Sequence, residues 1–301
     1  MADAGAPPRA VRETFAATVG SLLGELARVL AGAGVEDART EARDLVAAIL
    51  DMPRFWPAMN RDEPIDHAAA DACRAAARKR ARGAPFAYAV GRAAFRHLTL
   101  DVDERVLIPR QETEMLVEAV LERSAASGGI AVDVGTGSGA IALALATEAR
   151  FERVIATDIC RGALAVAASN ARRLGGALRA VVEMRHGSLL APVAGVRARA
   201  VVSNPPYIAY AEAAALPASV RDWEPPIALY SAAEGMAATT RLVRDAADVL
   251  EPRGLLALEL DARRASLAAE IALADGRYMD VAVRLDLAGR ERILLATRKV
   301  T

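Results

Sequence analysis

The stretch from residue 130 to residue 147 constrains the fold more than any other part of the sequence. A run of strand-forming residues, Ile130 to Val134, passes into a glycine-rich loop, and the helical segment Ala140 to Thr147 follows without a spacer. The loop consists of Gly135, Thr136, Gly137, Ser138 and Gly139. Glycines let a chain turn tightly and approach a ligand closely. A strand, a glycine loop and a helix in immediate succession are typical of the crossover unit of a parallel sheet.

Strand-like runs and helical segments alternate over the rest of the chain. The expected parallel strands are Ile130 to Val134, Val154 to Thr157, Val181 to Met184, Ala200 to Ser203 and Leu255 to Leu260. Two closing runs, Tyr278 to Arg284 and Ile293 to Thr297, are joined by a short link, so we expect them to be antiparallel neighbours. The sequence therefore predicts an α/β fold with a seven-stranded, Rossmann-like sheet whose last strand is antiparallel.

The N-terminal part has a different pattern. From about residue 11 to residue 82, apolar residues such as Leu22 and Leu26 recur at helical spacing, which predicts a small bundle of helices. The basic residues between Arg74 and Arg82 are expected to form a solvated helix face. The first ten residues are rich in alanine and proline, and we expect them to be disordered.

A change of pattern separates the two parts. Between Phe86 and Val102 the apolar runs shorten and gain β-branched and aromatic residues, with Gly91 as a turn, so we expect a β-hairpin to link the two parts. The predicted organisation is therefore a helical-bundle domain over residues 1–83, a linking β-hairpin over residues 84–104 and the sheet domain over residues 105–301.

Composition limits the classes of partner. Lys plus Arg and Asp plus Glu both number 38, so the chain has no overall positive charge with which to hold a polyanion. We therefore expect no stable complex with nucleic acid. Cys73 and Cys160 have no paired spacing, and the three histidines are scattered, so neither a disulfide framework nor a metal site is expected. The sequence shows no signal peptide and no apolar run long enough to cross a membrane, which predicts a cytoplasmic protein, expected to be a monomer.

An acidic residue follows the second expected strand. Asp158 ends the run Val154 to Thr157, about twenty residues after the glycine loop. A carboxylate at this place can accept hydrogen bonds from both hydroxyls of a ribose. The loop spacing G-x-G-x-G differs from the G-x-G-x-x-G of dinucleotide-binding loops. These two features favour a methyltransferase cofactor but leave a dinucleotide open.

The end of the fourth expected strand resolves this ambiguity. It runs into Asn204, Pro205, Pro206 and Tyr207, and two consecutive prolines hold the chain in a fixed extended turn. If this strand lies beside the first one, Asn204 and the glycine loop face one crevice. The Asn204 side-chain oxygen and the Pro205 carbonyl could then accept the N–H protons of a planar nitrogen and orient it toward a methyl donor. Tyr207 could stack on the planar group. The pattern therefore predicts methyl transfer to a planar nitrogen.

Further segments match one family. They are residues 84–91, residues 107–114 (Leu-Ile-Pro-Arg-Gln-Glu-Thr-Glu), residues 133–139, Asp158, residues 204–207, residues 220–225 (Val-Arg-Asp-Trp-Glu-Pro) and residues 286–290. With these segments the chain resembles the release-factor glutamine methyltransferases. That family uses S-adenosylmethionine to methylate the side-chain amide of the glutamine in the Gly-Gly-Gln loop of class I peptide chain release factors. The resemblance covers nearly the whole chain and implies a class I methyltransferase sheet.

The resemblance also implies roles for individual residues. The loop from Gly135 to Gly139, with Asp133 before it, would wrap the methionine part of the cofactor, and Asp158 would hold the ribose. Asn204 would contact both cofactor and substrate, and the segment Asn204 to Tyr207 would hold the substrate glutamine, with Asn204, Pro205 and Tyr207 as the catalytic residues. The helical domain would help to dock the release factor.

Several positions depart from the family pattern and leave alternatives open. The family usually has Pro at the position of Gln111, an acid and a large aromatic at Ser188 and Leu189, and Gly at Asp261. A diverged relative that methylates a small molecule is one alternative. An adenine N6-methyltransferase acting on a flipped base of nucleic acid is another, although the balanced charge argues against it. A non-catalytic binding protein would be expected to lack the polar site residues, yet Asp158, Asn204 and Tyr207 are present.

Overall fold

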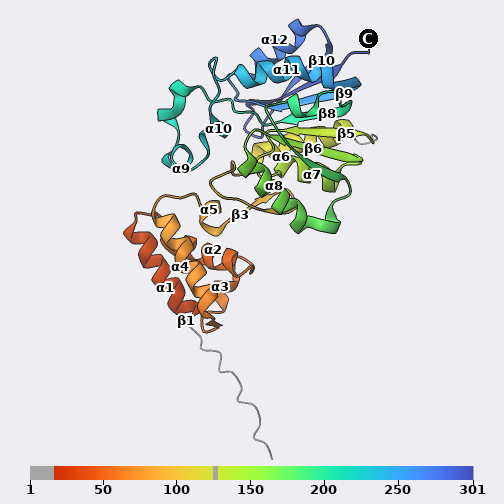
Figure 1. Cartoon of the computed structure of the whole chain (residues 1–301). Helices are drawn as coiled ribbons and strands as arrows, with labels where there is room; N and C mark the ends of the chain where they lie inside the picture. The colour runs from red at the N-terminus through yellow and green to blue at the C-terminus, as the bar shows by residue number, and fades with distance from the viewer. Residues whose placement is uncertain (1–16, 125–127, 301) are drawn as a thin grey trace, which may run out of the picture. The chain divides into compact units, whose positions relative to one another are not determined.

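The chain forms two compact units, Met1–Val90 and Gly91–Thr301. The computed structural model describes residues 17–124 and 128–300. The predicted disorder of the first ten residues therefore lies outside the described residues. Figure 1 shows the helical first unit and the sheet of the second.

The first unit packs its helices around a core of its own. Its elements are β1 (Ala17–Thr18), α1 (Val19–Gly32), α2 (Ala38–Ile49), α3 (Trp56–Met59), β2 (Pro64–Ile65), α4 (His67–Ala81) and α5 (Phe86–Val90). Side chains of Thr18, Asp37 and Asp66 cap α1, α2 and α4 by accepting backbone N–H groups of the first turn, which explains where these helices begin. The buried faces of α1, α2 and α4 form one apolar cluster, as the helical periodicity predicted.

The basic residues of α4 are not simply solvated. Arg74 forms a bidentate ion pair with Glu25 of α1, and Arg80 pairs with Glu41 of α2. The expectation of a solvated face is therefore wrong for Arg74 and Arg80, while Arg78 is exposed. A charge pattern along one helix does not reveal the acidic side chains that neighbouring helices bring to it.

The segment between the predicted domains divides differently from the expectation. Residues Phe86–Val90 form α5, and Phe86, Ala89 and Val90 pack against the core of the first unit. The hairpin is shorter and consists of β3 (Arg92–Phe95) and β4 (Leu98–Asp101). Gly91, with φ +74°, forms a turn between α5 and β3, so the expected turn at Gly91 is confirmed and stands just before the hairpin. Five residues are too few for a helical period to show in the sequence.

The second unit contains the predicted seven-stranded sheet. Its strands are β5 (Ile130–Val134), β6 (Arg153–Asp158), β7 (Val181–His186), β8 (Ala198–Ser203), β9 (Leu250–Glu259), β10 (Tyr278–Leu285) and β11 (Glu291–Arg298). The order is β10-β11-β9-β8-β5-β6-β7, and β11 runs antiparallel to both of its neighbours. The predicted fold class is confirmed. Because β5 lies between β8 and β6, the strand order reverses at β5, which is where such sheets bind ligands.

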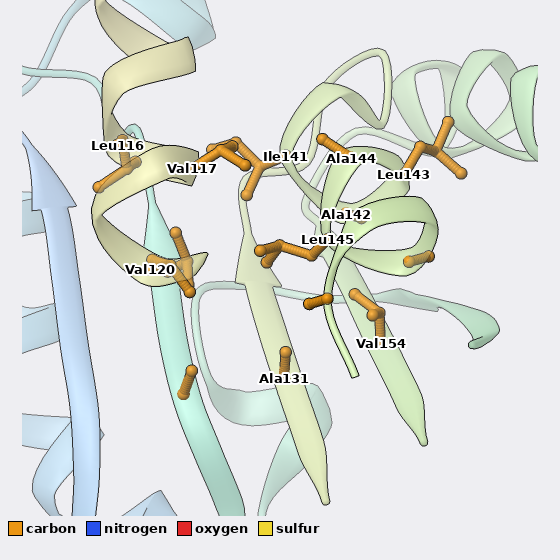
Figure 2. Close-up of a cluster of buried hydrophobic side chains, with 14 of the residues drawn as sticks. Leu116, Val117, Val120, Ala131, Ile141, Ala142, Leu143, Ala144, Leu145 and Val154 are labelled. Atoms are coloured by element: carbon orange, nitrogen blue, oxygen red, sulfur yellow. The ribbon is translucent and has the colours of Figure 1, made fainter. Parts of the chain in front are cut away.

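Helices cover both faces of the sheet. The helices of this unit are α6 (Gln111–Ser124), α7 (Ala140–Glu148), α8 (Arg161–Leu174), α9 (Ala218–Arg221), α10 (Pro226–Leu229), α11 (Ala237–Val249) and α12 (Ala265–Asp275), of which the short α9 and α10 belong to the connection between β8 and α11. One face packs against α6 and α7, and Figure 2 shows Val120 of α6 and Leu145 of α7 on the side of the sheet that carries Ala131 of β5 and Val154 of β6. The other face packs against α11 and α12. Burial on both faces explains the nearly continuous apolar runs of the central strands. No helix among the described residues is long and apolar enough to span a membrane.

Candidate active site

The glycine loop needs its glycines for backbone conformation. Gly135, Gly137 and Gly139 have φ angles of +73°, +55° and +86°. The carbonyl of Thr157 on β6 accepts the N–H groups of Gly135 and Thr136 at 2.8 and 2.9 Å. A Cβ added at Gly135 or Gly137 would meet no atom within 4 Å, so it would project into open space. The loop therefore presents bare backbone to a space beside the sheet edge.

Asp133 lies behind the loop and not in that space. Its carboxylate is fully buried and accepts hydrogen bonds from Thr136 Oγ1 at 2.6 Å and from the Ala142 amide at 3.0 Å. Burial raises its pKa to about 7, opposed by these two hydrogen bonds. Asp133 thus ties the end of β5 to the start of α7 and holds the loop in shape.

Asp158 stands at the tip of β6, as the sequence predicted. Its two carboxylate oxygens accept the amide of Gly137 at 3.0 Å and the amide of Cys160 at 2.8 Å. These bonds fix the carboxylate against the glycine loop. Each oxygen retains further lone pairs for a ligand hydroxyl.

The Asn-Pro-Pro-Tyr turn begins where β8 ends beside β5. Ser203 is paired with Val134, and its hydroxyl donates to the Val134 carbonyl at 2.6 Å. This contact places Asn204 next to the glycine loop, which confirms the expectation that the fourth strand lies beside the first. The Asn204 side-chain N–H₂ donates to the Thr113 hydroxyl at 3.1 Å.

A buried polar chain continues from Asn204. The Thr113 hydroxyl, at the start of α6, donates to Glu259 Oε2 at 2.6 Å, and the Tyr207 hydroxyl donates to Glu259 Oε1 at 3.4 Å. Burial raises the pKa of Glu259 to about 7, although the Thr113 hydrogen bond and the positive charge of Arg292 both act to lower it. Burial and the nearby Glu259 charge also raise the pKa of the Tyr207 phenol.

The sequence analysis did not identify Thr113 or Glu259 as site residues. Thr113 lies within residues 107–114, which carry the family resemblance, whereas Glu259 lies two positions before Asp261, where the sequence departs from the family pattern. No sequence spacing links two residues that are 146 positions apart.

Residues 208–231 form a segment, here called the strap, that leaves the turn and returns to it. The Ile208 amide donates to the Leu229 carbonyl at 3.0 Å, and the Ser231 amide donates to the Ile208 carbonyl at 2.9 Å. Near its middle, Glu224 is 3% exposed and forms an ion pair with Arg110 at 2.5 Å. This pair joins the Ile-Pro-Arg and Glu-Pro segments on which the family resemblance rests.

A cavity of about 560 Å³ lies between the glycine loop and the strap. The predicted site residues that line it are Gly135, Gly137, Asp158, Asn204 and Pro206. Ser188 and Leu189 are also in its wall, together with Ile159 and strap residues such as Ile227. A smaller hollow of about 50 Å³ on the other side of Asn204 is lined by Thr136 and Ser138 among others. A volume of a few hundred Å³ is typical of a small-molecule site.

Four predicted site residues line neither of these two spaces: Asp133, Gly139, Pro205 and Tyr207. Asp133 is buried behind the loop, and a Cβ on Gly139 would meet Leu143 at 3.0 Å, so both residues shape the loop from its inner side. The Tyr207 hydroxyl is directed toward Glu259. The part of the chain that the structure describes contains no group of three or more His, Cys, Asp or Glu side chains that could hold a metal ion.

Solved structures share this fold. The catalytic domain of hMettl16, in complex with MAT2A 3'UTR hairpin 6, covers 78% of this chain and 83% of its own, with a TM-score of 0.54 and 16% identity. A methyltransferase from Pyrococcus furiosus covers 67% of this chain and 90% of its own, with a TM-score of 0.50 and 19% identity. The family model described as methyltransferase small domain matches residues 110–218. The sheet and its switch-point site therefore define a class I methyltransferase.

Relatives with higher identity narrow the assignment. The release factor glutamine methyltransferase of Moorella thermoacetica is 44% identical, over 94% of this chain and 99% of its own length. That of Xylella fastidiosa (strain Temecula1) is 40% identical, over 88% and 95% respectively. The family model described as PrmC N-terminal domain matches residues 21–91, which is most of the first unit. The chain belongs to the release factor glutamine methyltransferase family.

Proposed function

We propose that this protein transfers a methyl group from S-adenosylmethionine to the side-chain amide nitrogen of the glutamine in the Gly-Gly-Gln loop of a class I peptide chain release factor. The observation that carries the proposal is the position of Asn204. Its amide lies in the wall of the cavity that also contains Gly135, Gly137 and Asp158. The Asn204 amide, which can recognise a planar nitrogen, thus lines the same cavity as the Asp158 carboxylate, which can bind the ribose of a nucleoside. Family membership supports glutamine as the acceptor.

The residues that line the cavity fit S-adenosylmethionine. Asp158 presents a fixed carboxylate for the two ribose hydroxyls, and the bare backbone at Gly135 and Gly137 leaves room for the methionine part. Ile159 and Leu189 would supply an apolar wall for the adenine. When bound, S-adenosylmethionine supplies an electrophilic methyl group on a positively charged sulfur.

The turn would hold the acceptor. The Asn204 Oδ1 atom and the Pro205 carbonyl accept the two N–H protons of the glutamine amide, which directs the nitrogen toward the methyl group. The Tyr207 ring stacks on the amide plane, while its hydroxyl is held by Glu259. These oxygens would stabilise the positive charge that develops on nitrogen as it takes the methyl group. The methyl–sulfur bond would break with its electron pair left on sulfur as a neutral thioether, and one N–H proton would leave to water.

The first unit would contribute to recognition of the protein substrate. It has its own core and a family-specific N-terminal domain match. We propose that it docks the release factor, that the enzyme acts as a monomer in the cytoplasm and that it forms no stable complex with nucleic acid.

The test is a transfer assay with cofactor labelled in the methyl group. The acceptors are a release factor, the same factor with Ala in place of the glutamine of the Gly-Gly-Gln loop, and duplex DNA. Label only on the wild-type factor supports the proposal. Equal label on the Gln→Ala factor would show that another residue is methylated, and label on DNA would favour the adenine N6 alternative. Absence of label on all three would favour a small-molecule acceptor.

Asn204→Ala separates the acceptor role from cofactor binding. The variant removes the oxygen that accepts the substrate proton, so we expect kcat to fall by about 100-fold or more. Cofactor affinity, measured by calorimetry, is expected to fall only modestly because Asp158 and the glycine loop remain. An Asn204→Ala enzyme with near-normal turnover would contradict the proposed role of the turn.

A further inference from the structure

The amide of Asn204 has two different ends, and only the oxygen can accept a substrate proton. A free asparagine side chain can present either end, because the two ends have almost the same shape. The structure holds this amide in a chain of hydrogen bonds that runs from Asn204 through Thr113 to Glu259. Thr113 is 4% exposed and Glu259 is 1% exposed, so water has little access to either side chain.

The number of protons in this chain determines its direction. An ionised carboxylate only accepts hydrogen bonds, so the single hydroxyl proton of Thr113 must point to Glu259, 2.6 Å away. The Thr113 oxygen then has only lone pairs for Asn204, so Asn204 must turn its N–H₂ group toward Thr113. Its oxygen is left for the cavity, whose wall Asn204 forms.

We propose that Thr113 and Glu259 are positioning residues that fix the Asn204 amide with its oxygen toward the acceptor nitrogen. The inference rests on the proposed function, in which the Asn204 oxygen accepts an N–H proton of the substrate. The two positioning residues explain why Asn204 presents its oxygen to the substrate and not its N–H₂ group. Neither residue needs to touch the substrate. Glu259 also holds the Tyr207 hydroxyl, so one carboxylate orients both side chains of the turn.

Protonation of Glu259 removes the directional constraint. A neutral Glu259 can donate to Thr113, which can then donate to the Asn204 oxygen and turn the N–H₂ group toward the substrate. The groups around Glu259 are the Thr113 hydroxyl, the Tyr207 phenol, the Arg292 guanidinium and the Glu112 carboxylate. Arg292 favours the ionised form, whereas burial and Glu112 oppose it. We therefore expect the activity to fall as the pH decreases through about 7.

The decisive comparison is Thr113→Val against Thr113→Ser. Valine keeps the shape of threonine but has no hydroxyl, whereas serine keeps the hydroxyl and loses one methyl group. We expect kcat to fall by about 10- to 100-fold for Thr113→Val, with cofactor affinity within about three-fold of wild type. Thr113→Ser should retain kcat within about three-fold. A Val variant with wild-type kcat, or a Ser variant as impaired as the Val variant, would overturn the proposal.

Glu259→Gln provides a second test if Thr113→Val folds poorly. A glutamine can either accept from Thr113 or donate to it, so it imposes no direction on the chain. We expect reduced kcat without the decrease below about pH 7 that the wild type shows. An unchanged pH profile would contradict the role of Glu259.

A measurement without turnover distinguishes this inference from the proposed function. Asparagine side-chain amide signals of ¹⁵N-labelled protein should show a hydrogen-bonded Asn204 N–H₂ group in wild type and in Thr113→Ser, and a shifted, more rapidly exchanging group in Thr113→Val. No difference between the Ser and Val spectra would overturn the inference. If the release factor itself is not methylated, the proposed function fails, yet this spectral comparison still decides the inference.

Discussion

At the residue scale, the site contains two buried carboxyl groups whose pKa values are both raised to about 7 by burial. Asp133 holds the glycine loop through Thr136 and Ala142, and Glu259 holds the turn through Thr113 and Tyr207. In the function we propose, Asp133 supports the cofactor side of the cavity and Glu259 supports the acceptor side. A buried charge is unfavourable, so each ionised carboxylate lowers the stability of the fold. The same carboxylate fixes the geometry of the site through its hydrogen bonds.

Glu259→Gln should reveal this loss of stability. An acid with a raised folded pKa binds more protons in the folded state than in the unfolded state between about pH 4.5 and 7. Its stabilising contribution is therefore present at low pH and lost as the pH rises through the folded pKa. We expect Glu259→Gln to be more stable than wild type at about pH 8, on the order of 1–3 kcal/mol, and the difference to shrink toward about pH 5.

Chemical unfolding at several pH values measures this difference. The matched control is Glu36→Gln, which makes the same change of side chain at an exposed position. A difference between Glu259→Gln and wild type that stays constant with pH would contradict the assignment of a raised pKa to Glu259.

At the element scale, the Asn-Pro-Pro-Tyr turn depends on a close backbone contact. Gly235 follows the strap with φ +85°, and a Cβ placed on it would lie 2.2 Å from the Tyr207 carbonyl and 2.6 Å from Arg264 Nε. Arg264 in turn binds Glu212 at 3.0 Å and the Glu234 carbonyl at 2.7 Å. The turn is therefore held from outside the cavity by a packed group that admits only glycine at position 235.

Gly235→Ala should disturb the site, whereas Gly276→Ala should not. Both positions have positive φ, so each substitution should cost about 1 kcal/mol in backbone strain. A Cβ on Gly276 meets no atom within 4 Å, but a Cβ on Gly235 collides with backbone, which should cost a further 1–3 kcal/mol or so. We expect Gly235→Ala to lower both the melting temperature and kcat more than Gly276→Ala does. Equal effects of the two substitutions, in thermal unfolding and in the transfer assay, would rule out the close contact.

The elements also show which features a sequence can reveal. The strands were predictable because burial on both faces requires continuous apolar runs, and the runs at Ile130 to Val134 and Ala200 to Ser203 match β5 and most of β8. Helix α5 was missed because its five residues are shorter than two helical turns. The Thr113–Glu259 bond joins residues 146 positions apart, so no local pattern contains it. Asn204 was predictable because the prolines beside it have a strong local signature.

At the scale of the whole molecule, the boundary between the units follows the cores. Phe86, Ala89 and Val90 belong to the apolar cluster of the helical unit, while Phe95, Leu98 and other hairpin residues belong to a cluster of the sheet unit. Each unit therefore buries its own apolar surface, which is the property of an independently folding domain. A boundary between residues 83 and 84 would separate Phe86, Ala89 and Val90 from the core of the helical unit. A boundary between residues 90 and 91 leaves the cores of both units whole.

This division allows recognition and chemistry to be separated. The fragment of residues 91–301 contains the cavity, the glycine loop, the turn and the strap. We expect it to fold, to bind S-adenosylmethionine within about three-fold of the full chain and to methylate a short Gly-Gly-Gln peptide with similar kcat/KM. For an intact release factor, loss of the helical unit, which we propose docks the factor, should raise KM by about ten-fold or more, equivalent to roughly 1.4 kcal/mol of lost binding. Peptide and intact factor are assayed side by side with both proteins. An equal loss on the two substrates would show that the helical unit supports the catalytic unit instead of docking the factor.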